Sequence, residues 1–387
     1  MKEKEIDDII TIIRKIYGEG FIPLHAPLFV GNEKKYINEC IDTTFVSSVG
    51  KFVDRIEEMM SEYTGAARCV ACVNGTSALH VGLMMAGVRD GDLVLTQPVS
   101  FIATCNAISY CGASPLFIDV DRDTMGMSPE VLRQWLESNT HRTADGSLVE
   151  NTTGRRIAAC VPMHTFGIPC RIDEITEICT QYNIPLVEDA AESIGSFYKG
   201  KHTGTFGDIG CVSFNGNKTI TTGGGGMILF RDKELGDRAK HLTTQAKVPH
   251  RWEFNHDMIG YNYRMPNINA ALGCAQLENL ERYVEAKRKV TARYADFFSR
   301  QSDIEFMTEL PESRANYWFN TILLPGREER DEFLERTNDN GVMTRPLWTL
   351  MHRLPMFRDC LRSDLSNSEY LAERAVNIPS GVILDLK

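Results

Sequence analysis

The sequence predicts an α/β protein, with a largely parallel β-sheet covered by helices on both sides and a smaller α+β region after it. Two observations support this fold class. Short apolar runs alternate with helical segments from Cys69 to about Phe230, and parallel strands need such crossover helices. Beyond Arg264 the pattern changes to a long helix followed by mixed elements. We therefore expect a large domain with an N-terminal helical arm over residues 1–265 and a smaller domain over residues 266–387.

The N-terminal arm is predicted to be mainly helical. Apolar residues recur at helical spacing over Ile6 to Ile16, Lys35 to Cys40 and Val53 to Tyr63. Between the first two helices, Pro23-Leu24-His25-Ala26-Pro27 should be extended, because proline restricts the residue before it.

The alternating region supplies the predicted sheet and its covering helices. Its apolar runs, expected as strands, are Cys69–Val73, Leu93–Thr96, Pro115–Asp119, Ile157–Pro162, Leu186–Glu188, Ile209–Phe214 and Met227–Phe230. Its expected helices are Ala78–Ala86, Phe101–Tyr110, Pro129–Glu137 and Asp173–Tyr182. The polar stretch from Thr140 to Arg156 should be a surface insertion, and Ile268 to Ser299 should form one long helix before the smaller region.

The composition limits the classes of partner. A net charge of −10 argues against non-specific binding to nucleic acid or to an anionic membrane. The charged start, Met1-Lys2-Glu3-Lys4-Glu5, does not resemble a signal peptide, and no stretch approaches the roughly 20 apolar residues of a membrane span. We expect a cytoplasmic protein.

The eleven cysteines lie mostly in apolar segments, which is typical of buried thiols in a reducing compartment. Cys69 and Cys72 have the spacing of a metal or redox pair. However, they fall in a predicted strand that points them to opposite faces, and no second pair or histidine cluster accompanies them. We expect no metal site.

Lys218 lies between the apolar run Ile209–Phe214 and four consecutive glycines, Gly223 to Gly226. The segment is not a P-loop, because Asn217 stands where that motif needs glycine and no helix-forming run follows. Two interpretations remain: a lysine that forms a Schiff base with a cofactor aldehyde, and a surface lysine in a strand connection. Glycine there allows the backbone to pass close beneath the lysine.

Two further segments favour a phosphorylated pyridine cofactor. The turn Asn74 to Leu79 opens a helix whose free N–H groups suit a phosphate, although an ordinary helix cap explains it equally. Asp189 follows a buried strand, where its carboxylate can pair with a protonated pyridine nitrogen or cap the next helix. Glu192, one turn further on, is placed to reach the phenolic oxygen of the same ring. With Lys218, these residues suit pyridoxal 5'-phosphate (PLP).

Four motifs carry a family resemblance. They are Asn74–Leu79, Val187–Glu192, Ser213–Lys218 and Gly260-Tyr261-Asn262-Tyr263-Arg264-Met265. From about His25 to Leu384 the chain resembles the DegT/DnrJ/EryC1/StrS sugar aminotransferases, which are fold-type I PLP enzymes that act on nucleotide-linked keto sugars. The resemblance implies a mostly parallel seven-stranded sheet and a smaller C-terminal α+β domain.

The resemblance also implies roles for individual residues. Lys218 would bind the cofactor aldehyde and move the proton between substrate and cofactor carbons, and Asp189 would hold the pyridine nitrogen. Asn262 would reach the cofactor phosphate of the neighbouring subunit, so the active sites would be shared in a homodimer. The other implied cofactor-binding residues are Gly75, Thr76, Ser77, Phe101, Glu192 and Ser213.

The implied substrate contacts are His164, Asn217, Arg264, Arg345 and Trp348. Arg345 suits a diphosphate and Trp348 suits a sugar or base, whereas core packing explains His164 and Trp348 equally. Within the family, the chain is most similar to transaminases that form UDP-4-amino-4,6-dideoxy-N-acetylglucosamine in legionaminic acid or bacillosamine pathways.

The expected reaction transfers an amino group from glutamate to C4 of a UDP-linked 4-keto-6-deoxy-N-acetylhexosamine. Two alternatives stay open. Pyridoxamine-dependent sugar dehydratases of this family carry histidine where this chain has Lys218. A non-catalytic sugar-nucleotide-binding homologue would not need Lys218 and Asp189 together.

Overall fold

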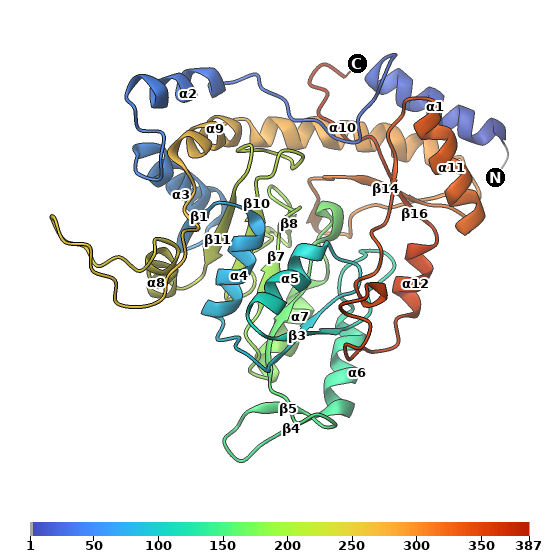
Figure 1. Cartoon of the computed structure of the whole chain (residues 1–387). Helices are drawn as coiled ribbons and strands as arrows, with labels where there is room; N and C mark the ends of the chain where they lie inside the picture. The colour runs from blue at the N-terminus through green and yellow to red at the C-terminus, as the bar shows by residue number, and fades with distance from the viewer. Residues whose placement is uncertain (1–2, 387) are drawn as a thin grey trace.

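A seven-stranded sheet forms the centre of the molecule, as predicted (Figure 1). The computed structural model describes residues 3–386. Four strands lie in the order β1-β11-β10-β7, and three lie in the order β3-β2-β6. Parallel bridges between the chain at β6 and the chain at β7 join the two sets. The strands are β1 (Arg68–Cys72), β2 (Leu93–Thr96), β3 (Ser114–Phe117), β6 (Ile157–Val161), β7 (Val187–Asp189), β10 (Ile209–Ser213) and β11 (Gly226–Phe230).

The sheet is mostly parallel, with one strand reversed. β10 runs parallel to β7, and β2 runs parallel to both β3 and β6. β11 is antiparallel to both of its neighbours, β1 and β10. This reversal follows from the short connection between β10 and β11, which carries Lys218 and has no room for a crossover helix.

Alternate residues of each strand enter different cores, so the sheet is buried on both faces. Cys69 and Ala71 lie in one apolar core, while Val70 and Cys72 lie in another. The prediction that Cys69 and Cys72 point to opposite faces is confirmed. Both faces need helical cover.

The helices cover the two faces of the sheet in groups. One group is α4 (Gly75–Met85), α5 (Ile102–Tyr110) and α8 (Lys233–Thr243), and the opposite face carries α3 (Lys51–Thr64), α9 (Asn267–Leu277), α6 (Pro129–Asn139) and α7 (Ile172–Gln181). α2 (Glu33–Asp42) packs against α9. The predicted helices of the alternating region are confirmed to within a few residues at each end.

The long helix expected from Ile268 to Ser299 is two helices. α9 ends at Leu277, and α10 (Leu280–Phe298) begins after a short break. Glu278 and Asn279, at this break, bind the N-terminal arm and the preceding turn: Glu278 accepts hydrogen bonds from Tyr36 and Arg55, at 2.7 Å each. α10 then crosses the molecule to the second sheet (Figure 1).

A second, antiparallel sheet follows α10. Its order is β12 (Glu305–Phe306), β14 (Asn320–Leu323), β16 (Ala375–Ile378) and β15 (Arg345–Pro346). One core joins this sheet to α1 (Glu3–Tyr17), α10 and α11 (Arg327–Asp339). The first helix of the chain therefore packs with its last third, while the division at residues 265 and 266 stays a prediction.

The remaining elements are short. They are β4 (Thr140–Arg142), β5 (Leu148–Glu150), β8 (Phe197–Tyr198), β9 (Lys201–His202), β13 (Ser313–Arg314), α12 (Ser366–Ala372) and the 3-10 turns Thr165–Gly167 and Met351–Arg353. The predicted insertion is the hairpin of β4 and β5. Its first strand is largely exposed but β5 is buried, so the insertion is only partly a surface feature.

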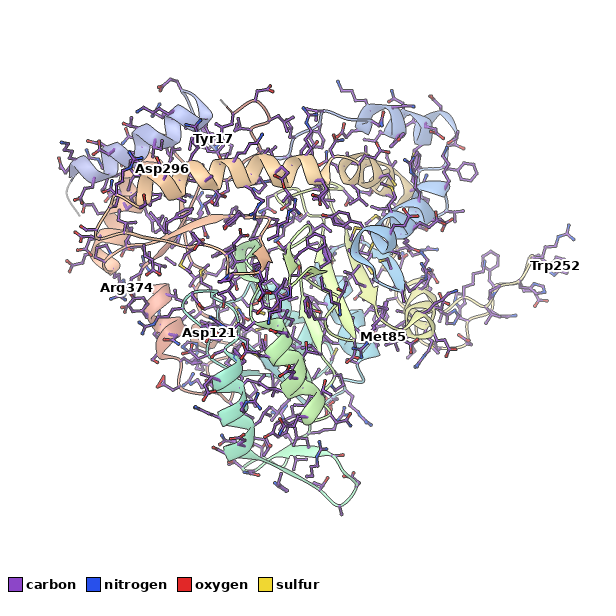
Figure 2. The ribbon with its side chains drawn as sticks, turned by 180° about the vertical axis from the view of Figure 1, so that it is seen from behind. Tyr17, Met85, Asp121, Trp252, Asp296 and Arg374 are labelled. Atoms are coloured by element: carbon purple, nitrogen blue, oxygen red, sulfur yellow. The ribbon has the colours of Figure 1, made fainter. Side chains whose placement is uncertain are left out.

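After α8 an arm leaves the body, with Trp252 near its tip (Figure 2). The arm exposes Trp252, Phe254, Met258 and Ile259. Among residues 3–386, no helix is long and apolar enough to cross a membrane. In the same range, no cluster of histidine, cysteine, aspartate or glutamate could hold a metal ion.

Candidate active site

A cavity of about 880 Å³ opens at the carboxyl ends of β7 and β10, next to the turn that begins α4. In open α/β sheets this edge is where ligands bind. Ten of the residues predicted for the site line it: Gly75, Thr76, Phe101, Asp189, Glu192, Ser213, Asn217, Lys218, Arg345 and Trp348.

The first end of the cavity is a tight turn at the start of α4. Asn74 caps the helix, because its Oδ1 accepts a 2.7 Å hydrogen bond from the Ser77 N–H. Gly75 lies so close to β10 that an added Cβ would be 2.9 Å from the Cβ of Ser213. The turn thus brings helix N–H groups and the Ser213 hydroxyl together, in an arrangement that suits an anion.

The glycine run Gly223–Gly226 allows the backbone to pack closely against this turn, and not against Lys218. A Cβ on Gly226 would lie 2.5 Å from the carbonyl carbon of Asn74, and one on Gly225 would collide with the hydroxyl of Thr222. A Cβ on Gly224 would meet nothing within 4 Å. The expected close passage beneath Lys218 is therefore corrected: the close backbone approach is between Gly226 and the Asn74–Gly75 turn.

Asp189 is buried at the end of β7, and both of its carboxylate oxygens have partners. Thr104 donates a 2.6 Å hydrogen bond to Oδ2, and the Ala191 N–H donates one of 3.1 Å to Oδ1. Burial raises the pKa of the carboxyl, while the bonds from Thr104 and Ala191 and the charge of Lys218 act to lower it. A buried carboxylate held in this way is ready to pair with a cationic ring nitrogen.

Lys218 and Glu192 form an ion pair inside the cavity, with Nζ 3.1 Å from Oε1. The other oxygen of Glu192 accepts a 2.9 Å hydrogen bond from the Phe166 N–H. Burial raises the pKa of Glu192 to about 7, against the opposing effects of Lys218 and the Phe166 N–H. The pair keeps the lysine amine directed into the cavity and away from bulk water.

Residues beyond α10 hold the lysine loop. The indole N–H of Trp318 donates a 2.7 Å hydrogen bond to the carbonyl of Asn217, and its ring lies beneath Lys218. The amide of Asn316 donates to the carbonyl of Glu192 at 2.8 Å and to the Thr219 hydroxyl at 3.2 Å. The position of the lysine therefore depends on side chains about a hundred residues further along the chain.

The wall of the cavity also contains Phe101, Arg345 and Trp348. Phe101 is half-buried just before α5, and its ring meets that of Trp348 edge-on at 6.1 Å. Trp348 also packs on Phe166, so the packing interpretation and the cavity-lining interpretation both hold for it. Arg345 is exposed on β15 and donates to Asn338 and to a carbonyl, and no carboxylate within residues 3–386 pairs with it.

Four predicted site residues lie outside this cavity. Ser77 is buried in α4, and its N–H is engaged by Asn74. His164 is fully buried and hydrogen-bonded to Glu188 at 3.0 Å, so it is a core histidine and its expected substrate contact is corrected. Asn262 and Arg264 lie on the arm side, bonded to each other at 3.2 Å. Their predicted roles require a second subunit.

The sequence and the fold of the chain are similar to those of known proteins. The family model of the DegT/DnrJ/EryC1/StrS aminotransferases matches residues 29–387. The chain belongs to this family.

Several relatives match this aminotransferase over nearly its whole length. It is 38% identical over 362 residues to the GDP-perosamine synthase of Escherichia coli O157:H7, covering 93% of each chain. It is 34% identical over 362 residues to that of Caulobacter vibrioides, with the same coverage. The solved structure of the aminotransferase TlmJ from Streptoalloteichus hindustanus superimposes with a TM-score of 0.85 at 27% identity, over 95% of both chains.

PLP is the cofactor of this family, and the residues of the aminotransferase fit it. The turn at Gly75, tight enough to exclude a Cβ, offers a place for the phosphate, and Asp189 offers a carboxylate for the ring nitrogen. Lys218 presents a primary amine to the same cavity. When bound, PLP carries the amino group between substrates and withdraws electrons from the reacting carbon.

The geometry indicates what the side chains do around that group. Asp189 would hold the positive charge of a bound ring nitrogen in a buried site, where the interaction is stronger than in water. The Nζ of Lys218 would be placed in the same cavity to take and return a proton, and Glu192 accepts a hydrogen bond from it. Trp318 and Asn316 contact the loop that carries the lysine and so position it.

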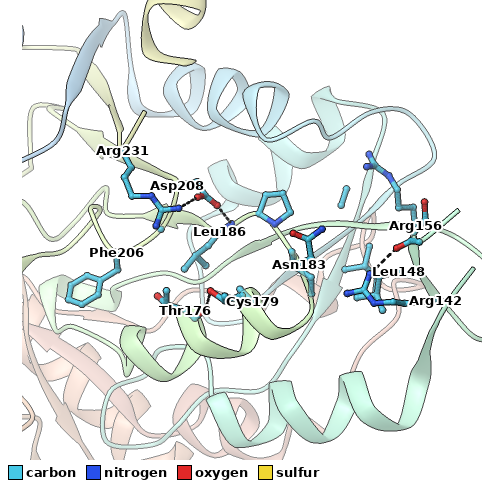
Figure 3. Close-up of a pocket in the computed structure, with 18 of the residues that line it drawn as sticks. Arg142, Leu148, Arg156, Thr176, Cys179, Asn183, Leu186, Phe206, Asp208 and Arg231 are labelled. Carbon is cyan, nitrogen blue, oxygen red and sulfur yellow. Dashed lines mark hydrogen bonds and ion pairs between the residues drawn. The ribbon is translucent and has the colours of Figure 1, made fainter. Parts of the chain in front are cut away.

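A second groove of about 530 Å³ lies at the amino ends of the strands (Figure 3). Three arginines line it, and each already has partners: Arg142 donates to two carbonyls, Arg156 pairs with Asp92, and Arg231 pairs with Asp208. These charges are engaged, and they lie at the edge of the sheet opposite to the predicted site.

The sequence prediction missed several residues that shape the site. They are His25, Thr104, Asn316, Trp318, Phe319 and Asn377. A signal existed for Thr104, which follows Phe101 by three residues in the helix after the second strand. For the others no local pattern marked the residue, because they approach the cavity from the N-terminal arm and the second sheet.

Proposed function

We propose that this aminotransferase transfers an amino group from glutamate to the C4 keto carbon of a nucleotide-linked 4-keto-6-deoxy sugar. UDP-linked 4-keto-6-deoxy-N-acetylhexosamine is the proposed acceptor, and a UDP-4-amino-4,6-dideoxy sugar is the product. The observation that carries the proposal is one cavity that is lined by Lys218, Asp189, Arg345 and Trp348 together. This combination provides an amine and a carboxylate for PLP together with a cation and an aromatic ring for a nucleotide sugar.

The relatives favour a sugar nucleotide without deciding its base. Two of them are named GDP-perosamine synthase, whereas the resemblance seen in the sequence favours a UDP-linked substrate. Arg345 is suited to a diphosphate with either base. We therefore keep UDP as the proposal and treat GDP-linked substrates as its direct competitor in the experiment below.

The proposed enzyme is a homodimer with shared active sites. The arm after α8 exposes Trp252, Phe254 and Ile259 to solvent, and large apolar side chains gathered on one extended segment are typical of an interface. Asn262 follows this arm directly and lies outside the cavity of its own chain. A second copy would bring Asn262 to the cofactor phosphate of its neighbour.

The test is transamination by the purified PLP-loaded enzyme. We expect it to convert a UDP-linked 4-keto-6-deoxy-N-acetylhexosamine in the presence of glutamate, with ping-pong kinetics and an NMR-assigned amine at C4. GDP-linked 4-keto-6-deoxymannose is tested as a second substrate under the same conditions. Preference for the GDP sugar would reject the proposed base, and release of a dehydrated product would favour the dehydratase alternative.

Lys218→Ala tests the assignment of the lysine. This variant should lose turnover, and the exposed Lys289→Ala should retain it. Substantial transamination by Lys218→Ala would remove Lys218 from the mechanism. PLP binding without turnover of any keto sugar by the wild-type enzyme would favour the non-catalytic alternative.

A further inference from the structure

His25 lies in the extended segment between α1 and α2, and its side chain lines the active-site cavity. The backbone just before His25 is fixed. The Met343 N–H donates a 2.9 Å hydrogen bond to the carbonyl of Ile22, and the Ser380 N–H donates one of 2.8 Å to that of Leu24. The segment that carries His25 is therefore tied to residues next to β15 and β16 of the second sheet.

Both ring nitrogens of His25 are buried, and neither has a hydrogen-bond partner among residues 3–386. Leaving a buried polar group unpaired is destabilising, so such groups are rare in native proteins. The two nitrogens of one imidazole carry this cost together. Because the ring faces a cavity and not closed core, a ligand is the natural source of the missing partners.

The charge state of His25 narrows the kind of ligand. Burial holds its pKa well below the ordinary value, and the nearby positive charges of Lys287 and Lys218 lower it further. The ring is thus neutral near pH 7, with one N–H donor and one nitrogen acceptor. A phosphate or carboxylate offers acceptors only and can pair only with the N–H of the ring. The hydroxyl and amide groups of a sugar include both donors and acceptors, so two of them can pair with both nitrogens.

The charged parts of a nucleotide sugar have other partners in the cavity. Arg345 has no carboxylate partner in the described chain, which suits a diphosphate. The turn at Gly75 and Ser213 suits the phosphate of PLP. The uncharged sugar ring then remains for a neutral donor and acceptor.

We infer that His25 is a sugar-binding residue whose imidazole exchanges hydrogen bonds with an uncharged polar substituent of the hexose. The inference rests on the proposed function, since it requires a sugar in this cavity. It makes His25 a determinant of sugar recognition and leaves binding of the nucleotide and of glutamate to other residues.

The experiment compares binding of nucleotide sugars and bare nucleotides by calorimetry. The probes are UDP-N-acetylglucosamine and GDP-mannose, each against UDP or GDP, with the PLP-loaded enzyme. In wild type the sugar should add affinity. His25→Ala should lower the nucleotide-sugar affinity about tenfold, the equivalent of one hydrogen bond, and should leave the bare nucleotide within about twofold. His25→Gln, which keeps a neutral donor and acceptor, should recover part of the loss.

Two controls keep the outcome specific. His141→Ala removes an exposed histidine of the β4–β5 hairpin and should change neither affinity. Glutamate converts bound PLP to its pyridoxamine form, and stopped-flow absorbance monitors this conversion. The rate should be similar in His25→Ala and in wild type, and a similar rate also shows that the variant is correctly folded.

Each result decides between the two proposals. Equal losses for sugar-linked and bare nucleotides in His25→Ala, or no loss at all, would overturn the role of His25 alone. If wild type bound no nucleotide sugar, the proposed function and the role of His25 would both be overturned.

Discussion

The Nζ atom of Lys218 lies 3.7 Å from the ring centroid of Trp318, and the indole N–H of the same tryptophan binds the carbonyl of Asn217 at 2.7 Å. One side chain thus contacts the lysine twice, through its ring and through the backbone of the preceding residue. A cation over a desolvated indole face is stabilised by about 2 kcal/mol. Trp318 therefore fixes where the amine points.

Replacing Trp318 should separate these two contacts. Trp318→Phe keeps a ring but loses the hydrogen bond, and we expect kcat to fall about tenfold. Trp318→Ala loses both, and a fall of about a hundredfold is expected because a misplaced catalytic group costs this much. Steady-state kinetics with saturating substrate measures both, with Trp135→Phe, on α6 outside the cavity, as the control. Full kcat in Trp318→Ala would show that the loop holds Lys218 unaided.

The glycine run allows a matched pair of substitutions. Gly226→Ala would place a Cβ 2.5 Å from the carbonyl carbon of Asn74, so the phosphate turn must shift. We expect at least tenfold weaker PLP binding, because the turn has no space to relax. Gly224→Ala meets nothing within 4 Å and should bind PLP as wild type does. Fluorescence titration of apoenzyme with PLP measures both, and equal affinities would contradict the close approach.

Glu192 should leave a signature in the pH dependence of stability. Burial raises its pKa to about 7, so between pH 4.5 and 7 the folded apoenzyme holds more proton at this carboxyl than the unfolded chain does. The free energy of unfolding then falls as pH rises through this window, by at most about 1.4 kcal/mol per pH unit. Glu192→Gln should remove this slope.

Chemical denaturation of the apoenzyme at pH 5, 6, 7 and 8 tests the Glu192 prediction. The stability of Glu192→Gln relative to wild type should increase up to about pH 7 and then level off. Glu58→Gln, at an exposed position on α3, is the control and should run parallel to wild type. Parallel curves for Glu192→Gln as well would mean that Glu192 is ionised throughout this range.

Lys287 should change the free energy of unfolding with pH in the opposite direction to Glu192. This lysine is fully buried in α10, donates to the carbonyls of Trp318 and Ser380, and has its pKa lowered by burial to about 7. Between pH 7 and 10 the unfolded chain binds more proton, so the free energy of unfolding rises with pH.

Lys287→Met should abolish that rise, whereas the exposed Lys289→Met, two residues along the same helix, should preserve it. Chemical denaturation between pH 7 and 10 distinguishes them. A rise of equal size in wild type and Lys287→Met would assign the effect to another group.

The sequence located Lys218 and Asp189 because both follow short apolar strands at the edge of a parallel sheet, where chain order predicts proximity. It did not locate Trp318 or Asn316, since their contacts with the lysine loop depend on how the second sheet packs against the first. Likewise the apolar spacing continues across Glu278 and Asn279, so periodicity alone joined two helices into one. For His164 the sequence left a substrate contact and core packing both open, and the structure places the buried ring beside Glu188 in the core.

The packing of α1 against the second sheet has a consequence for synthesis. The apolar face of α1, with Ile6 and Ile13, finds its partners on α10 and on β16, whose Ile378 is translated long after α1. At about 5–20 residues per second, a ribosome leaves that face uncovered for roughly 20–70 s. His25 and Asn377 line the same cavity although they lie far apart in the sequence. A nascent chain therefore acquires its complete pocket only after Asn377 has emerged, and shielding of α1 until then should govern the yield of active enzyme.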